Sequence, residues 1–278
     1  MAVLYKGDSP AQKLPAPGGP LGPTGFRRVL AYVRTPRRPV LMAELLLIGV
    51  TYWVYSMIRN AVPDHQAGAV ERGFELWRFQ QQNLNIDIEM WINQTIHGVE
   101  WLVIAMNYFY ATMHFVVTAA VLVWLYRCHP GRYRASRTVL AITTCLALFG
   151  YFLYPLAPPR LLPGTGFVDT IRVHETWGSV TSGDMQELSN QYAAMPSMHA
   201  GWSMWCGIII VMFARRRWTQ ILGALYPLTT LVVIMATANH FVLDAVGGWL
   251  TLGAGFLLQW VLYGRPAYAF AREVATVT

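Results

Sequence analysis

The sequence predicts an all-α membrane protein, a polytopic bundle of about six transmembrane helices. Of its 278 residues, 55% are hydrophobic and only 13% are charged, a composition too apolar for a soluble domain of this length. The apolar residues gather in runs close to the roughly 20 residues that a helix needs to cross a bilayer. The basic residues lie beside these runs, which is the third sign of a membrane protein.

Six runs are long and apolar enough to be spans. They cover about 40–58, 101–126, 137–156, 196–213, 219–238 and 241–263. The spans separate the chain into three expected parts: a Pro- and Gly-rich, disordered basic tail over 1–39, a membrane domain over 40–264 and a short tail over 265–278. We expect no cleaved signal peptide, because no short apolar core with a cleavage site precedes the first span.

Lys and Arg set the orientation, because cytoplasmic loops retain them in excess. With the N-terminus inside, the cytoplasmic side holds all of them except Arg59, Arg72, Arg78, Arg160 and Arg172. Both termini of this multi-pass cell-membrane protein are therefore expected in the cytoplasm. The net charge of +7 forms no single basic face, so it indicates membrane anchoring and no nucleic-acid partner.

Two connections between the spans stand out. After the first span, apolar and polar residues each recur at the spacing of one helix face. The apolar face is Val70, Phe74, Trp77, Leu84, Ile88 and Trp91. The polar face is Glu71, Glu75, Arg78, Gln82, Asn85 and Glu89. Such a helix suits the outer membrane surface, as an anchor or a lid. The loop from Ala157 to Met195 is far longer than a usual connection, and long loops tend to carry function.

Reactive and phosphate-binding residue types cluster at three span ends, in the segments Tyr154–Arg160, Ala194–His199 and Asn239–Asp244. The topology from charge brings all three to the extracytoplasmic face. His240 and Asp244 are four apart, so on a helix the carboxylate can orient one ring nitrogen and leave the other basic. This predicts His240 as a nucleophile for phosphorus, Asp244 as its orienter and His199 as the general acid.

Two further residues suit phosphate binding. Ser197 lies in the first turn after Pro196, where free backbone N–H groups and the helix dipole favour an anion. Arg160 offers a fixed cation whose fork matches phosphate oxygens. Both have plainer interpretations, because Ser197 could simply cap a helix and Arg160 could reach for lipid headgroups.

Asn107, Tyr110 and His114 form a polar stripe in the second span, at steps of three and four. They are candidates for lining a headgroup-binding cavity, with hydrogen bonding between helices as the open alternative.

The site residues resemble the type 2 phosphatidic acid phosphatase superfamily. There, a Pro-Ser-Gly-His segment supplies the acid and a later His-x-x-x-Asp segment the nucleophilic pair. Here the similar segments read Pro196-Ser197-Met198-His199 and His240 with Asp244, and only Met198 departs. The resemblance covers about residues 100–263. It implies a membrane enzyme that acts on lipid-linked phosphate through a phosphohistidine, without a metal or other cofactor.

Within that superfamily, the chain is most similar to the inositol phosphorylceramide synthase-like branch. The wider family has cations at the positions of Leu153 and Ile234, and the branch tolerates their loss. Its first motif, of the type Pro-x-x-Pro-Pro-Arg, precedes a Gly-Phe-x-Asp segment, here Gly166-Phe167-Val168-Asp169. The resemblance implies a phosphatase or a phosphotransferase, which share the first half-reaction and differ in whether water or an alcohol is the acceptor.

The expected partners are therefore the membrane and a lipid phosphate or phospholipid substrate; the acceptor and the oligomeric state stay open. A non-enzymatic transporter or scaffold is the alternative class, in which His114, His240 and Asp244 would form a proton or ion path. A membrane metalloenzyme is the third class, and it predicts sensitivity to chelators.

Overall fold

A computed structural model describes residues 34–35, 39–61, 66–174, 176 and 191–273. In these residues the regular structure is helical, and the only β-type pairing is an isolated bridge between Leu156 and Ala193. The fold is a helical membrane bundle, as the composition and the apolar runs predict. Most of the tail predicted over 1–39 lies outside the described residues.

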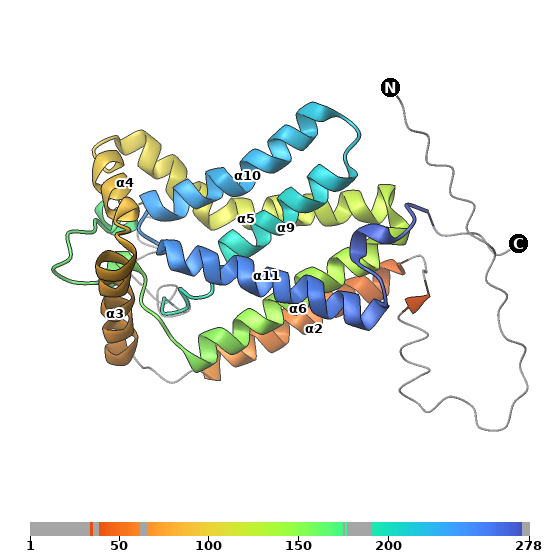
Figure 1. The fold of residues 1–278 in the computed structure, drawn as a ribbon, viewed down its shortest axis with the longest axis horizontal. Helices are drawn as coiled ribbons and strands as arrows, with labels where there is room; N and C mark the ends of the chain where they lie inside the picture. Colours follow the sequence, from red (N-terminus) through yellow and green to blue (C-terminus); the bar gives the residue numbers. More distant parts are fainter. Residues whose placement is uncertain (1–33, 36–38, 62–65, 175, 177–190, 274–278) are drawn as a thin grey trace, which may run out of the picture.

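The six predicted spans correspond to six helices that run along the long axis of the molecule (Figure 1). They are α2 (Leu41–Ala61), α5 (Glu100–Cys128), α6 (Pro130–Leu153), α9 (Met198–Phe213), α10 (Arg217–Ala236) and α11 (Val242–Tyr263). Of these, α5, α6, α10 and α11 are long and apolar enough to cross a membrane, while α9 and the first part of α2 are apolar but shorter. Large apolar side chains such as Leu46, Phe149 and Leu250 point outward, as lipid-facing helices require.

One helix boundary differs clearly from the prediction. α6 begins at Pro130 instead of 137, because Pro130 is well suited to the first helical turn and the charged residues that follow it are accommodated within the helix. Arg137 forms an ion pair of 2.9 Å with Glu44 of α2, and the Tyr133 hydroxyl donates to the same carboxylate at 3.2 Å. This polar cluster joins α2 to α6.

Residues 265–273 pack on the bundle. The Arg132 side chain donates to the Phe270 carbonyl at 2.8 Å, and the Arg272 side chain donates to the Cys128 carbonyl at 2.9 Å. Phe270 is only 3% exposed. The first part of the predicted tail over 265–278 therefore packs against the helices around the α5–α6 turn.

At the opposite end of the bundle, two further helices lie beside the ends of the six (Figure 1). α3 (Gln66–Leu84) lies across this end, and α4 (Ile88–Ile96) packs against α10. The continuous helical period predicted from Val70 to Trp91 is broken, because Asn85 takes a left-handed conformation with φ 53° and ends α3. As a result Glu89, predicted on the exposed polar face, is buried at 1% exposure.

α9 is the central helix and contacts α5, α6, α10 and α11. Glycines permit its close approach to two neighbours. A Cβ added at Gly248 of α11 would lie 2.2 Å from the Ser197 carbonyl oxygen, and one added at Gly207 of α9 would lie 2.7 Å from the Gly223 carbonyl oxygen of α10. The starts of α9 and α11 are therefore held together at backbone contact distance.

This close approach predicts that Gly248→Ala separates α9 from α11. We expect a loss of about 1–3 kcal/mol in the free energy of unfolding, typical of overpacking, measured by thermal unfolding in detergent. Gly253→Ala is the matched control: a Cβ there meets nothing within 4 Å, so the substitution is expected to leave stability unchanged or raise it by roughly 0.5–1 kcal/mol. Equal effects of the two substitutions would contradict this account of the α9–α11 contact.

Candidate active site

The predicted nucleophile lies in a tight turn between α10 and α11. The backbone N–H groups of Asn239 and His240 both donate to the Ile234 carbonyl, at 3.0 and 3.2 Å. His240 is 4% exposed and Asp244 is fully buried. His240 Nδ1 lies 3.4 Å from Asp244 Oδ2, so the pair predicted from spacing does meet.

The sequence predicts that His240 and Asp244 lie one turn apart on the same helix, and the structure brings them together differently. His240 precedes the helix, and Asp244 is the third residue of its first turn. There Asp244 Oδ2 accepts a hydrogen bond from the Phe241 backbone N–H at 2.8 Å, as an N-terminal carboxylate commonly does. The same oxygen therefore fixes the start of α11 and faces the histidine ring.

The predicted acid reaches the nucleophile from α9. His199 Nδ1 lies 3.4 Å from His240 Nε2, the nitrogen that Asp244 does not face. The Ser197 backbone N–H donates to the Asp244 carbonyl at 2.9 Å, which ties the start of α9 to the start of α11. Two histidines 41 positions apart in sequence are thereby held with one ring nitrogen of each directed at the other.

Ser197 caps α9. Its hydroxyl oxygen accepts a hydrogen bond of 3.3 Å from the Ala200 N–H, and the residue is fully buried. A hydroxyl that accepts one bond can still donate its own proton, so capping is compatible with the predicted phosphate contact.

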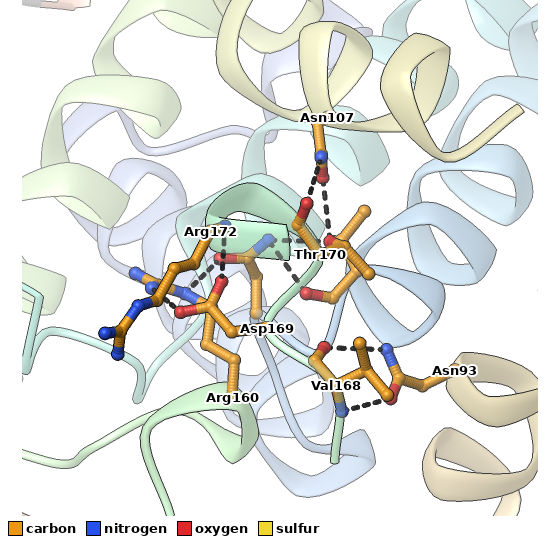
Figure 2. Close-up of polar contacts among 9 residues, drawn as sticks. Asn93, Asn107, Arg160, Val168, Asp169, Thr170 and Arg172 are labelled. Carbon is orange, nitrogen blue, oxygen red and sulfur yellow. Dashed lines mark hydrogen bonds and ion pairs between the residues drawn. The ribbon is translucent and has the colours of Figure 1, made fainter. Parts of the chain in front are cut away.

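Arg160 lies in a short 3-10 helix, η1 (Pro159–Leu161), beside the nucleophile turn. Its Nε donates to Asn239 Oδ1 at 2.9 Å, and its backbone N–H donates to the Ala238 carbonyl at 2.9 Å. A terminal nitrogen also pairs with Asp169 Oδ2 at 3.3 Å (Figure 2). Arg160 is thus directly coupled to the residue before His240, and sequence reasoning missed Asn239 although it adjoins the nucleophile.

Two asparagines hold the loop that carries Asp169 (Figure 2). Asn93 of α4 accepts from the Val168 N–H at 2.8 Å and donates to the Val168 carbonyl at 3.2 Å. Asn107 of α5 exchanges hydrogen bonds with Thr170, which lies at the start of α7 (Thr170–Val173). Asn107 also donates to Thr176 at 2.8 Å. The side-chain amide of Asn107 is thereby hydrogen-bonded to the loop. This predicted headgroup-binding residue therefore has a structural role.

Tyr110 and His114 lie against the predicted acid. The Tyr110 ring stacks on the His199 ring with centroids 4.1 Å apart, and the His114 ring meets it edge-on at 4.3 Å. A small hollow between α5, α9 and α10 reaches all three side chains. Two of the three predicted headgroup residues therefore form the wall behind the acid.

The two positions where the wider family carries cations are apolar and differently placed. Leu153 is 75% exposed on the outside of the bundle, and Ile234 is fully buried next to the nucleophile turn. Among the described residues, Arg160 is therefore the cationic side chain that contacts the turn between α10 and α11, which carries His240. In the same part of the chain, no group of three or more His, Cys, Asp or Glu side chains is arranged to hold a metal ion.

A histidine beside a carboxylate, a second histidine opposed to it and a fixed arginine are residue types that suit phosphate-ester chemistry. A family model described as the PAP2 superfamily matches residues 75–258, more than half of the chain. The chain belongs to the PAP2 superfamily, and this membership supports a phosphatase or phosphotransferase acting on phosphate esters. Searches of curated proteins and of solved structures found no match.

The contacts of Arg160 predict that a lysine cannot replace it. Lysine has a single nitrogen and cannot serve Asn239, Asp169 and a phosphate together, so Arg160→Lys is expected to lower kcat/KM about 10- to 100-fold, as expected for one lost charge-assisted hydrogen bond. Arg172→Lys, at an exposed side chain two residues beyond Thr170, should leave kcat/KM within about twofold. Steady-state kinetics on a phosphate ester make the comparison, and full activity of Arg160→Lys would remove Arg160 from phosphate binding.

Proposed function

We propose that the chain is a membrane phosphotransferase or phosphatase that moves the phosphate group of a lipid phosphate or phospholipid through a covalent phosphohistidine on His240. The observation that carries this proposal is the opposition of His240 Nε2 and His199 Nδ1 at 3.4 Å, with Asp244 on the other nitrogen of His240. This contact supports the proposal, because it brings a candidate nucleophile and a candidate proton donor within reach of the same phosphate group.

The first half-reaction follows from these contacts. His240 Nδ1 faces Asp244 Oδ2 at 3.4 Å, and a proton held on Nδ1 beside this carboxylate leaves the Nε2 lone pair free to attack phosphorus. As the P–N bond forms, the bond from phosphorus to the leaving oxygen breaks and His199 gives that oxygen its proton. Asp244 stabilises the positive charge that develops on the ring.

In the second half-reaction, water or an alcohol attacks the phosphohistidine. His199 takes the proton of the attacking oxygen, the P–N bond breaks, and both histidines return to their starting states. Water gives a phosphatase and a lipid alcohol gives a phosphotransferase.

The charge around the site favours a phosphodiester over a phosphomonoester. Arg160 already has Asp169 as an ion-pair partner, and Leu153 and Ile234 bring no charge. A site with one partly neutralised cation suits the single negative charge of a diester better than the two charges of a monoester. This supports the inositol phosphorylceramide synthase-like branch and a phospholipid donor.

The site is assigned to the extracytoplasmic face of the cell membrane with both termini in the cytoplasm. The distribution of Arg in the described residues supports this orientation: Arg127 lies in the last turn of α5, Arg132 in the first turn of α6 and Arg217 in the first turn of α10, all at the end of the bundle away from α3 and α4. The apolar outer surface of the surrounding helices suits lateral entry of a lipid from the bilayer.

Turnover in the presence of a chelator tests the enzyme. We expect purified protein to release headgroup or phosphate from a panel of phospholipids and lipid phosphates, with and without an alcohol acceptor. His240→Ala should lower turnover roughly 10000-fold or more, and His199→Ala roughly 100- to 10000-fold. His97→Ala, at an exposed histidine on the same outer side, is the control and should keep wild-type turnover.

Two results would contradict the proposal in different ways. No turnover on any donor, with or without acceptor, would favour a transporter or scaffold. Turnover that the chelator abolishes, together with a stoichiometric bound metal, would favour a metalloenzyme.

The choice of phosphodiester predicts a substrate preference. We expect kcat/KM for phosphatidylinositol to exceed that for phosphatidic acid of matched acyl chains by about tenfold or more, equivalent to roughly 1.4 kcal/mol of transition-state stabilisation. Competition between the two lipids in mixed micelles measures the ratio, and a preference for phosphatidic acid would contradict the charge argument.

A further inference from the structure

Two buried polar side chains of the outer helices take no part in the chemistry above. Gln80 of α3 is fully buried and Glu89 of α4 is 1% exposed. Burial of a polar group costs free energy unless it is hydrogen-bonded, so the partners of these two side chains decide what they do.

The two side chains form a chain of hydrogen bonds that ends on α11. Gln80 Nε2 donates to Glu89 Oε1, and Gln80 Oε1 accepts from the Leu243 backbone N–H at 2.9 Å. Leu243 belongs to the first turn of α11, where backbone N–H groups have no partner within the helix. Gln80 supplies that missing acceptor from another element.

Leu243 lies between His240 and Asp244, so this contact acts on the reactive turn itself. The same turn is held from within by Asp244 Oδ2 on the Phe241 N–H, and from α9 by the Ser197 N–H on the Asp244 carbonyl. The outer helices thus add a third, independent restraint on the backbone that carries the nucleophilic pair.

α4 also holds the other side of the turn. One residue of α4, Asn93, donates to the Ala236 carbonyl at 2.8 Å, at the end of α10. The helices on both sides of His240 are therefore tied to the outer pair of helices, at Ala236 before it and at Leu243 after it.

The surroundings of Glu89 disfavour a negative charge on its carboxyl group. Burial raises the pKa of its carboxyl, the negative charges of Asp87 and Asp244 raise it further, and hydrogen bonds from its own backbone and from Gln80 lower it. Within the described residues no Lys or Arg forms an ion pair with it. Burying the Glu89 carboxyl close to the Asp244 carboxylate costs folding free energy. Proteins keep such unfavourable arrangements mainly at functional sites, where the surrounding structure compensates for them.

We propose that Gln80 and Glu89 are positioning residues, which fix the first turn of α11 and so hold His240 and Asp244 in the geometry for attack on phosphorus. The kinetic consequence rests on the proposed function. On this account α3 and α4 form a fixed brace over the nucleophile turn, in contrast to a mobile lid or a simple membrane anchor.

Kinetics of Gln80→Met test the brace, because methionine keeps the volume and removes both hydrogen bonds. We expect kcat to fall roughly 10- to 100-fold with KM within about twofold, since a misplaced nucleophile slows chemistry more than binding. Glu89→Gln keeps a neutral hydrogen-bonding side chain and should retain kcat within about threefold, whereas Glu89→Leu should match Gln80→Met. Gln82→Met, on the exposed side of α3, is the matched control and should behave as wild type.

Hydrogen exchange tests the same contact without any turnover. Gln80→Met should speed amide exchange in peptides covering Phe241–Ala245 while the later turns of α11 keep wild-type protection. Should Gln80→Met fail to fold in detergent, Gln80→Asn takes its place, because its shorter side chain cannot reach Leu243 and Glu89 together.

The outcomes separate the two proposals. Unchanged exchange at the start of α11, or wild-type kcat in Gln80→Met, overturns the brace even if the enzyme is active. A uniform loss of protection over the whole bundle, or a loss of activity in Glu89→Gln equal to that in Glu89→Leu, also overturns it. An inactive wild type overturns the proposed function alone, and the exchange result still decides whether the brace exists.

Discussion

The hydrogen bond from the Ser197 N–H to the Asp244 carbonyl is the contact on which the site depends. It joins the first turns of α9 and α11, and it forms only because Gly248 leaves room for the Ser197 backbone. This contact brings His199 to His240. A side chain at Gly248 would separate the acid from the nucleophile while leaving each residue in place on its own helix. In the proposed mechanism, general acid catalysis therefore depends on how closely α9 and α11 approach each other.

Polar residues outside the reacting pair form a continuous scaffold around it. Arg160 reaches the turn through Asn239, and the loop bearing Asp169 is anchored by Asn93 and Asn107. Each buried amide in this scaffold uses both its donor and its acceptor, which is what a low-dielectric interior demands of polar groups. The scaffold leaves one partly neutralised cation, Arg160, beside the turn that carries His240, and the proposed preference for a phosphodiester rests on this limited charge. One outer helix, α4, contacts both parts of the site, because Asn93 forms hydrogen bonds with Val168 in the loop and with the Ala236 carbonyl at the end of α10.

Much of this follows from sequence because hydropathy and charge report directly on a membrane fold. The six apolar runs locate the long helices, and the spacing of His240 and Asp244 with the segment ending at His199 identifies residues that the structure brings together. The brace could not be predicted, because the positive φ of Asn85 breaks the helical period and turns Glu89 inward, although the uninterrupted period places it among exposed residues. Asn93 and Asn239 were equally hidden as scaffold residues, since an asparagine in sequence carries no sign of which backbone groups it will meet. For Asn107, the sequence predicts either a headgroup contact or structural hydrogen bonding, and the structure shows its amide bonded to Thr170 and Thr176. Helix starts such as Pro130 were misjudged because a hydropathy window treats basic residues as loop.

The most direct test of the account is to trap the covalent intermediate. Purified protein is mixed with a phospholipid whose phosphorus is labelled, quenched in alkali within a single turnover, and digested for mass spectrometry of the labelled peptide. The account predicts an alkali-stable, acid-labile adduct on the peptide that contains His240, absent from His240→Ala. Turnover by the wild type with no adduct on that peptide, or with label on another residue, would contradict the central claim that His240 is the nucleophile.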